Sequence, residues 1–429
     1  MLDIELFRNN LELILESERK RFKDPSNAEK VLEYDTKWRT ILQELQDLRK
    51  LRNDVSVQIG EFKKNGEQQK AKEAIKKSTK IKEKIEELDK ERLEFFQQRE
   101  KYRYQVGNIL HATVPVGETE DSNEIVRIVG EIPKFDFKPL SHVDLISEID
   151  GADMKKASEI VGSRFFYLKG DIVHLNLALL KYALDKLTSK NYIPMWTPFF
   201  TKYEIMKAAA ELVDFEEQLY KIDGEDLFMI ATSEQPLAAY HYDEIIEPER
   251  LPLKYAGISS CFRREAGSHG KDTLGIFRVH RFEKVEQFIF CKPEESWKYH
   301  EELILNAEEL YKELKLPYRI TNIASGELND NAAKKYDLEA WFPASGTYRE
   351  LVSCSNCLDY QARKLKIRMG KVGSEQTKEI VHTLNATAIA TERTICCILE
   401  NYQNKDHSIT VPQVLQKYMN GRKILKSIK

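Results

Sequence analysis

The residues best suited to chemistry lie in one short stretch of the second half of the chain. Arg263 and Glu265 close one predicted strand, and Arg278, Phe282 and Glu286 lie on a second strand after a glycine-rich loop. Side chains an even number of positions apart share a face of a strand, so charged groups and an aromatic ring gather on one side of a sheet. Such groups are costly to bury unless they are paired or bind a ligand, and a purely structural network is the weaker alternative. We predict that Arg263 grips a phosphate, Phe282 stacks on a purine and Glu286 holds an ammonium group.

A second candidate lies where an apolar helix pattern begins at about Thr391. Arg393 falls in the first turn of that helix, and Asn385 and Thr387 share a face of the strand before it. A cation at a helix N-terminus opposes the helix dipole, so its presence indicates an anionic ligand near both. The alternative is an ordinary solvent-exposed arginine.

Two further groups are weak signals when each is taken alone. Glu350 and Ser353 belong to one predicted strand, and Thr232 and Glu234 precede a proline at a favourable first-turn helix position. No Walker-type phosphate loop and no GxGxxG sequence is found, so nucleotide binding has to use a sheet with paired arginines.

The elements that must position these residues form a mixed domain from about Glu118. Short strands joined by hairpin turns predict an α+β fold, with an antiparallel sheet flanked by helices. We expect an amphipathic helix over Ile172–Leu187 and an edge strand over Tyr192–Phe200, which two prolines interrupt. The other expected strands span Leu227–Ala231, Tyr255–Phe262, Phe277–Phe290, Tyr318–Asn322, Asp337–Phe342, Tyr348–Ser353 and Glu379–Thr387.

The N-terminal part has a different pattern. From Trp38 to Phe62 the seam positions recur in alternating steps of three and four residues, the spacing of one helix packed against another. After the reversal signal Asn65-Gly66 the spacing resumes and runs to Ile109. We expect two antiparallel helices, over about 28–64 and 68–112, that form a rod on the order of 40 to 60 Å long.

The turn of this rod is strongly basic. Residues 63–84 contain nine lysines and three glutamates, a net +6, although the whole chain has 67 basic and 70 acidic residues and a net −3. Lysines without aromatic neighbours suit contact with a phosphate backbone and offer little for reading bases. The alternatives are a dimerisation or spacer coil and a merely solvated charged face.

The composition excludes several classes of protein. With 429 residues, 41% hydrophobic and 32% charged, the chain is not collagen-like, disordered or a disulfide scaffold. No segment approaches the roughly 18 uninterrupted apolar residues of a membrane span. Six cysteines and an N-terminus without a signal or transit pattern favour the cytosol. Cys354 and Cys357 have no second pair at zinc-site spacing, so no zinc is expected.

Together these features closely resemble the seryl-tRNA synthetase family over nearly the whole chain. The resemblance rests on the lysine-rich arm and on FRREAGSHGKDTLGIFRVHRFEKVEQF, YRELVSCSNCLDYQARK and TLNATAIATERTICCILENYQ. Three class II synthetase motifs are matched, by the helix and strand ending at Pro198, the hairpin Arg263–Glu286 and the segment ending at Arg393. The segment LNAT resembles the eukaryotic cytosolic branch. The resemblance implies a tRNA-binding domain over 1–117 and a class II catalytic domain over 118–429 with a short basic tail.

The resemblance implies an ATP-dependent ligase that forms seryl-adenylate and pyrophosphate, then moves the seryl group to the terminal adenosine of serine tRNA. By similarity, Arg263 bridges the serine carboxylate and the α-phosphate, Glu265 and Phe282 hold adenine, and Arg278 and Arg393 take the outer phosphates. The implied catalytic residues are Arg263, Glu286, Glu350 and Arg393. The implied ATP set is Arg263, Glu265, Arg278, Val279, Phe282, Glu350, Ser353 and Arg393, and the serine set is Thr232, Glu234, Arg263, Glu286, Asn385 and Thr387.

The resemblance also implies a metal ion and macromolecular partners. Glu350 and Ser353 would hold Mg²⁺, and because they are three positions apart they need a bulge or strong twist to share one ion. In a homodimer, the arm would contact the long variable arm of serine tRNA, and of selenocysteine tRNA where one exists. Leu274 and Arg281 depart from the common Arg and Gln of the family, in the region of acceptor-end contact. The lysines implied for tRNA are Lys63, Lys64, Lys70, Lys72, Lys76, Lys77 and Lys80.

Three other functions are weighed against this one. A catalytically silent scaffold would have lost Arg263, Glu286, Glu350 or Arg393, and all four are present. An enzyme that charges a carrier protein would lack the arm. A threonine, proline or histidine enzyme would carry an anticodon-binding domain after Arg393, where only 36 residues follow.

Overall fold

The computed structural model describes residues 1–209, 216–266, 274–371, 373 and 378–426, which divide into two compact units. One unit is Leu2–Gly107, and the other is the chain from Asn108 onward together with Met1. Most of the predicted glycine-rich loop and the last residues of the basic tail lie outside the described residues. In the part of the chain that is described, no helix is long and apolar enough to cross a membrane.

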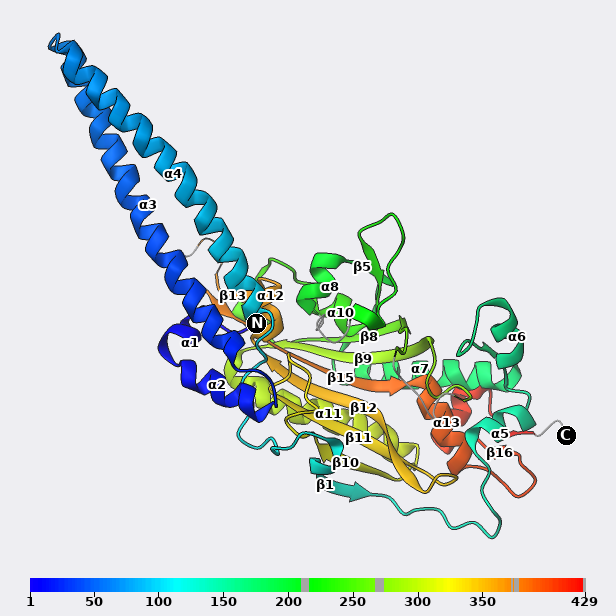
Figure 1. Ribbon diagram of the computed structural model, residues 1–429. Helices are drawn as coiled ribbons and strands as arrows, with labels where there is room; N and C mark the ends of the chain where they lie inside the picture. The colour runs from blue at the N-terminus through cyan, green and yellow to red at the C-terminus, as the bar shows by residue number, and fades with distance from the viewer. Residues whose placement is uncertain (210–215, 267–273, 372, 374–377, 427–429) are drawn as a thin grey trace. The chain divides into compact units, whose positions relative to one another are not determined.

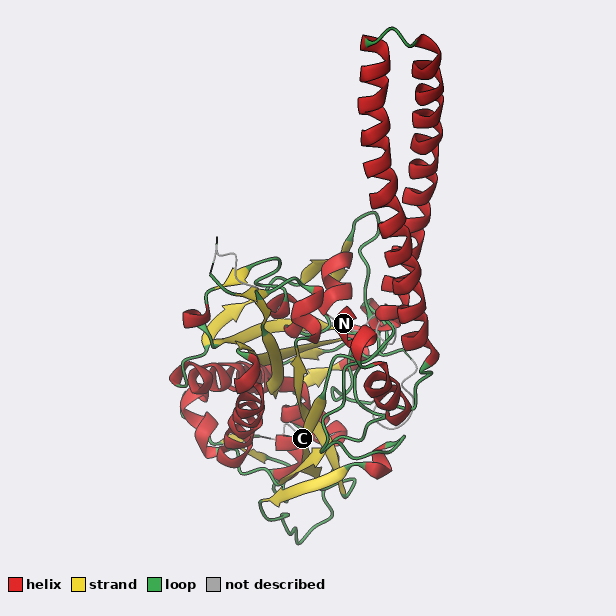
Figure 2. Cartoon of the chain, turned by 90° about the vertical axis from the view of Figure 1, so that its left-hand side faces the viewer, coloured by secondary structure: helices red, strands yellow, loops and turns green. Residues whose placement is uncertain are grey.

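The first unit is helical. Its long helices α3 (Ser26–Lys64) and α4 (Gln68–Arg103) run side by side in opposite directions (Figures 1 and 2), after the short α1 (Ile4–Asn9) and α2 (Leu11–Lys20). At 1.5 Å per residue, the 39 residues of α3 span about 58 Å. The buried seam consists of Ile41, Leu45, Val55, Ala74, Ile81, Ile85 and Leu88. All of these lie on the seam that the three-and-four spacing predicts, so the two-helix arm is confirmed.

The second arm helix ends before the expected residue 112. It stops at Arg103, and beyond it the backbone N–H of Asn108 donates to the carbonyl of Asp330 at 2.7 Å instead of to a preceding helical turn. Val106 is fully buried without being helical. Apolar spacing therefore indicates which residues are buried, and here it overestimates the length of the helix. The two compact units divide after Gly107.

Asp35 of α3 connects α3 to α1 and α4 through ion pairs at the base of the arm. Its fully buried carboxylate accepts hydrogen bonds from Arg8 of α1 at 2.8 and 2.9 Å and from Arg99 of α4 at 2.9 Å. Burial alone would raise the pKa of this carboxyl, but the two guanidinium groups outweigh burial and lower it. Arg99 also lies over the rings of Trp38 and Phe96, at 5.0 and 4.8 Å.

An eight-stranded sheet forms the centre of the second unit, in the order β1-β10-β11-β12-β15-β9-β8-β4. Neighbouring strands are antiparallel except β4 and β8, which are parallel at one edge. The expected α+β architecture and the edge strand before Phe200 are therefore confirmed. The strands are β1 (Glu124–Val129), β4 (Ile193–Trp196), β8 (Leu253–Phe262), β9 (Arg281–Cys291), β10 (Tyr318–Asn322), β11 (Lys334–Phe342), β12 (Thr347–Leu358) and β15 (His382–Ala390).

The two faces of this sheet differ. In β9, Val285, Ile289 and Cys291 point into the main core, whereas Phe288 and Phe290 belong to a smaller apolar cluster on the opposite face. The helices that contribute to the main core include α5 (His142–Glu148), α7 (Gly170–Ser189), α11 (Ser296–Glu313), α13 (Thr391–Asn401) and α14 (Gln413–Gln416). The helices around the smaller cluster are α8 (Tyr203–Ala209), α10 (Glu234–Ala238) and α12 (Tyr360–Lys364). All six cysteines are free and buried.

Some strand boundaries differ from the sequence expectation. β9 begins at Arg281, not Phe277, and the backbone N–H of His280 donates to the carbonyl of Arg164 outside the sheet. The strand expected from Glu379 is interrupted, so that β14 (Glu379–Ile380) is separate from β15. Both changes lie outside Arg281–Cys291 and His382–Ala390, so the candidate site residues of β9 and β15 are still in strands.

Candidate active site

A polar cavity of about 240 Å³ opens beside the smaller apolar cluster. Its walls come from the β8–β9 hairpin, from β12 and β15, and from the start of α13, elements that adjoin in Figure 1. The cavity residues expected from the sequence all line it: Thr232, Glu234, Arg263, Glu265, Arg278, Val279, Phe282, Glu286, Glu350, Ser353, Asn385, Thr387 and Arg393. The fold thus brings together segments that are far apart in the chain.

The β8–β9 hairpin supplies the cationic and aromatic part of the site. The guanidinium of Arg263 lies 5.1 Å from the ring centre of Phe282, and its Nε donates to the carbonyl of Ala231 at 3.3 Å. Arg278 faces Glu265, with 3.9 Å between Nη1 and Oε2. The Nε of Arg278 is buried and has no hydrogen-bond acceptor among the described residues. A buried donor without an acceptor is costly, and a bound phosphate oxygen would satisfy it.

Glu286 lies at the bottom of the cavity and is 1% exposed. Its carboxylate forms an ion pair with Lys284, and the hydroxyl of Thr387 donates to Oε2 at 3.5 Å. Burial raises the pKa of Glu286, and the nearby cations Lys284 and Arg263 oppose that rise. A buried carboxylate in this setting is suited to a cationic ligand.

Glu234 is held by two side-chain amides. Asn385 of β15 and Gln361 of α12 donate to its Oε1 at 3.1 and 2.8 Å, and Gln361 in turn accepts from Thr383 at 2.9 Å. Charge-assisted hydrogen bonds of this kind fix the orientation of a carboxylate. The expected grouping of Glu234 with Asn385 is therefore present as a direct contact.

Glu350 and Ser353 share the cavity because β12 has a bulge between them. Ser353 pairs with Asp337 and Glu350 with Glu339, so Leu351 is an extra residue without a partner in β11. A bulge shifts the alternation of side chains by one position, which brings residues three apart to the same face. Of the two expected alternatives, a bulge or a strong twist, the strand has the bulge.

Arg393 lies in the first turn of α13 and contacts Glu350. Its Nη1 donates to the carbonyl of Glu350 at 3.0 Å and lies 3.5 Å from Oε2, and its guanidinium lies over the ring of Phe277 at 5.2 Å. Partial desolvation would raise the pKa of Glu350, whose side chain is 48% exposed, but the positive charges of Arg393 and Lys335 outweigh it and lower the pKa. The carboxylate is thus ionised at neutral pH.

Several lining residues are absent from the sequence prediction. Lys284 belongs to the same strand face as Phe282 and Glu286, so alternation along β9 is a signal that could have found it. Lys335 and Asn331 reach the cavity from β11 and the loop before it, and no local pattern marks them. Of the two family departures, Leu274 is 61% exposed and Arg281 forms an ion pair with Glu283.

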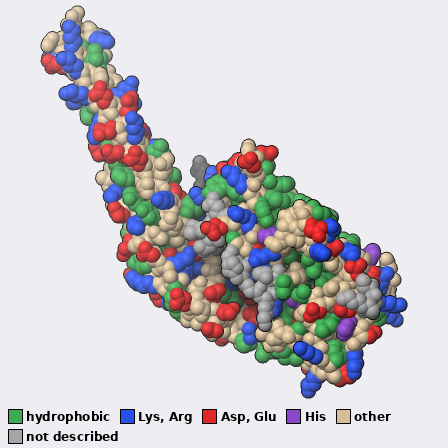
Figure 3. Space-filling view, turned by 45° about the vertical axis from the view of Figure 1, so that its right-hand side comes forward, with side chains coloured by type: hydrophobic (Ala, Val, Ile, Leu, Met, Phe, Trp, Pro, Cys, Tyr) green, Lys and Arg blue, Asp and Glu red, His purple; other side chains and the backbone are tan. Residues whose placement is uncertain are grey.

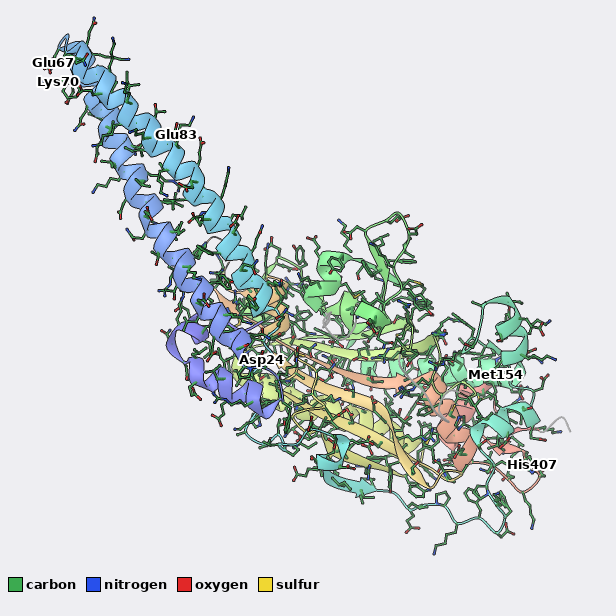
Figure 4. The ribbon with its side chains drawn as sticks, viewed as in Figure 1. Asp24, Glu67, Lys70, Glu83, Met154 and His407 are labelled. Atoms are coloured by element: carbon green, nitrogen blue, oxygen red, sulfur yellow. The ribbon has the colours of Figure 1, made fainter. Side chains whose placement is uncertain are left out.

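The seven lysines expected to bind tRNA are all exposed at the end of α3 and in the first turns of α4. Figure 3 shows Lys and Arg side chains over the outer part of the arm, with acidic side chains between them. Lys70 forms an ion pair with Glu67 at the tip (Figure 4). For the six others, no ion pair occurs within the described ranges.

An antiparallel sheet with paired arginines on its hairpin and at the start of α13 defines a class II aminoacyl-tRNA synthetase. The profile of the class II tRNA synthetase core domain (G, H, P, S and T) matches residues 216–402. The profile of the seryl-tRNA synthetase N-terminal domain matches residues 1–110, and the chain belongs to the seryl-tRNA synthetase family.

Similar proteins match the whole chain. Serine–tRNA ligase of Methanosphaera stadtmanae is 58% identical over 100% of both chains. The cytoplasmic serine–tRNA ligase of Homo sapiens is 45% identical over 98% of this chain and 89% of its own. The crystal structure of seryl-tRNA synthetase from Pyrococcus horikoshii complexed with ATP has a TM-score of 0.95 at 44% identity and covers 100% of both chains.

Proposed function

We propose that this cavity activates serine with ATP and then transfers the seryl group to the terminal adenosine of tRNA. The activity follows from the family: the chain is an ATP-dependent serine–tRNA ligase. The observation that carries its assignment to the cavity is the convergence there of Arg263, Glu286, Glu350 and Arg393. The reaction begins when a carboxylate oxygen of serine attacks the α-phosphorus of ATP and pyrophosphate leaves.

ATP is bound by the hairpin and the start of α13. Arg263 bridges the serine carboxylate and the α-phosphate, Phe282 stacks on adenine, and Glu265 with Val279 contacts its edge. Arg278 and Arg393 hold the outer phosphates. The buried Nε of Arg278, which lacks an acceptor among the described residues, supports a role in phosphate binding. The ATP complex of the Pyrococcus horikoshii relative supports the choice of nucleotide.

Serine is bound at the bottom of the cavity. Glu286 accepts hydrogen bonds from the ammonium group, and Thr232, Glu234, Asn385 and Thr387 surround the rest of the amino acid. A site that hydrogen-bonds a substrate hydroxyl rejects an analogue without it by about 10⁴-fold or more, whereas threonine has to be excluded by its extra methyl group.

Glu350 and Ser353 fit a magnesium ion that enters with ATP. One carboxylate and one hydroxyl suit an ion that prefers oxygen and keeps phosphate and water oxygens as its other ligands. Among the residues that the structure describes, no cluster of three or more His, Cys, Asp or Glu forms a metal site. When bound, the ion would neutralise charge that develops on the departing pyrophosphate. Arg393 positions the Glu350 carboxylate by direct contact.

No side chain is required as a general acid or base in the activation step. The attacking carboxylate is already ionised, and pyrophosphate leaves as an anion. Catalysis then depends on alignment by Arg263 and on the positive charges around the phosphates.

The arm contacts tRNA through its lysines, and the enzyme acts as a cytoplasmic homodimer. The support for tRNA contact is a cluster of exposed lysines with few acidic partners at the tip. Contacts to the phosphate backbone suit recognition of the long variable arm of serine tRNA by its shape. The same contacts would serve selenocysteine tRNA where it exists. The names of relatives from Arabidopsis thaliana and Homo sapiens support a cytoplasmic location.

Amino-acid-dependent ATP–pyrophosphate exchange tests this assignment. Purified protein is assayed with each of the standard amino acids in turn, without tRNA. Exchange with serine alone is the expected result. Exchange with none of them would refute the function proposed for the cavity, and the Arg263→Ala variant serves as the inactive reference.

A further inference from the structure

Glu265 has a backbone conformation that is unusual for its type of residue. Its φ is 49°, in the left-handed region that residues with a side chain seldom adopt, apart from asparagine and aspartate. Its carboxylate lines the cavity, and its side chain is 14% exposed. Such a conformation persists at a binding site only where the surrounding structure holds it in place. The contacts around Glu265 must therefore favour this conformation over the more common ones.

Gln218 makes three of these contacts from outside the cavity. It is the last residue of the short 3₁₀ helix η2 (Glu216–Gln218), and its backbone carbonyl accepts from the N–H of Arg264 at 2.8 Å. Its side-chain Nε2 donates to the carbonyl of Ala266 at 3.1 Å, and its Oε1 accepts from the N–H of Ala266 at 3.0 Å. One glutamine thus binds the backbone on both sides of Glu265.

Two other residues hold the same turn at different points. Arg164 donates from Nη1 to the carbonyl of Glu265 at 3.0 Å. The backbone N–H of Arg263 donates to the carbonyl of His280 at 2.9 Å, and the Nδ1 of His280 lies 2.9 Å from the carbonyl oxygen of Arg263. These contacts hold Glu265 and the residue two positions before it, whereas Gln218 holds the two direct neighbours of Glu265.

The direction of the Glu265 side chain depends on this backbone conformation. A change of φ to the negative values that most residues adopt would turn the Cα–Cβ bond, and the carboxylate with it, away from its present place 3.9 Å from Arg278. In the proposed function this carboxylate meets the edge of adenine. That edge carries a 6-amino group, which donates to a carboxylate, whereas guanine has an acceptor oxygen at the same position.

We propose that Gln218 is a positioning residue that holds the Glu265 carboxylate in the direction needed to recognise adenine. It acts through the backbone of Arg264 and Ala266 and touches neither substrate. Without its side chain the turn would relax, and ATP would bind only the fraction of molecules in which Glu265 still points at the base. The apparent affinity for ATP would fall by that fraction. This inference rests on the proposed function, which assigns Glu265 to adenine.

The Gln218→Ala variant tests the proposal, because it removes both side-chain hydrogen bonds and keeps the backbone one. We expect the KM for ATP in ATP–pyrophosphate exchange to rise about 5- to 30-fold, the loss of two exposed hydrogen bonds. The KM for serine at saturating ATP should stay within about twofold. The matched control is Gln416→Ala, which removes a half-buried glutamine whose Nε2 donates to the carbonyl of Val411 at 3.1 Å. This control should leave the KM for ATP and the KM for serine within about twofold of the wild type.

Purine riboside triphosphate, which lacks the 6-amino group, separates the positioning of Glu265 from general damage to the site. The wild type should prefer ATP to this analogue by about tenfold or more in KM, the effect of one hydrogen bond to a charged group. In Gln218→Ala the KM for the analogue should change less than about twofold, because the analogue has no hydrogen bond with Glu265 to lose. The preference for ATP should therefore narrow. An equal rise in the KM for both nucleotides would overturn the proposal.

A double-mutant cycle with Glu265→Asn completes the test. Asparagine tolerates a positive φ, but its side chain is shorter and carries no charge. If Gln218 acts through Glu265, Gln218→Ala should raise the KM for ATP less in the asparagine background than in the wild type, and strictly additive effects would contradict the proposal.

The outcomes also distinguish this inference from the proposed function. Absence of serine-dependent exchange in the wild type would refute the proposed function first. A wild type that uses ATP and the analogue equally well would refute the assignment of Glu265 to adenine, and this inference with it. An active wild type that prefers ATP, with an unchanged KM for ATP in Gln218→Ala, would refute only this inference.

Discussion

Replacing three lysines of the arm should weaken tRNA binding without touching amino-acid activation. Lys72, Lys76 and Lys80 recur every four residues on α4, so they share one side of the helix. All three are exposed, and none forms an ion pair within the described parts of the chain. The Lys72→Gln/Lys76→Gln/Lys80→Gln variant therefore removes charge with little expected effect on the fold.

The magnitude follows from counterion release. Each phosphate contact contributes about 0.7 to 0.9 to the slope of log K against log salt, so three contacts contribute roughly 2.1 to 2.7. Between about 50 and about 200 mM salt, a fourfold change, the difference in tRNA affinity between wild type and variant should shrink by roughly 20- to 40-fold.

The assay is the KM for serine tRNA in aminoacylation at both salt concentrations, with tRNA-independent exchange measured in parallel. Lys298→Gln/Lys312→Gln/Lys315→Gln is the matched control, because it removes three exposed lysines from α11 and its C-terminal end. We expect a steep salt dependence for the wild type and the control, and a shallower one for the arm variant. Equal slopes for the arm variant and the wild type would refute phosphate contact by these lysines.

Three further changes are expected to have defined effects. Asp35→Asn should cost about 3–5 kcal/mol in the free energy of unfolding of the arm unit, as for a broken buried ion pair. Because Arg8 and Arg99 outweigh burial and lower the Asp35 pKa, this stability is present at neutral pH and is lost as pH falls below about 4, so the variant should lose less on acidification. Leu45→Ala, in the arm seam, should cost about 2–5 kcal/mol by urea unfolding followed by circular dichroism. Glu350→Gln should slow exchange at low magnesium by at least about tenfold, with partial recovery as magnesium is raised.

Matched variants separate these effects from general damage. Asp89→Asn removes a carboxylate that is 34% exposed and pairs with Arg49 and Arg92, and should cost at most about 1 kcal/mol. Leu93→Ala, at a position 51% exposed, should be nearly neutral beside Leu45→Ala. A Glu350→Gln enzyme whose magnesium dependence equals that of the wild type would exclude this carboxylate as a metal ligand.

Strand alternation allowed much of the site to be predicted, because Phe282 and Glu286 share a face of β9 whatever the strand pairs with. The same rule predicts Lys284. Alternation cannot predict that β15 pairs with β9 and that β12 pairs with β15, since strand order depends on long-range pairing that no local pattern records. The meeting of Glu350 with the hairpin arginines was therefore expected only through the family resemblance.

The errors at element ends also have physical causes. Val106 satisfies the helical spacing because it is buried, and burial is all that apolar spacing measures. The helix nevertheless stops at Arg103, where later backbone groups find partners in distant segments such as Asp330. Lys335 and Asn331 were not predicted for the same reason. They line the cavity because their segment packs against segments that are distant in sequence.

The burial of all six cysteines makes this enzyme convenient for site-specific labelling. Burial raises the pKa of Cys261, Cys354 and Cys396, which suppresses the reactive thiolate as well as access to it. A cysteine introduced at the exposed Gln69 would therefore react with a maleimide dye while the native thiols stay unmodified. With a second dye on the other compact unit, energy transfer would test whether the distance between the two dyes changes when tRNA is added, without removal of any native cysteine.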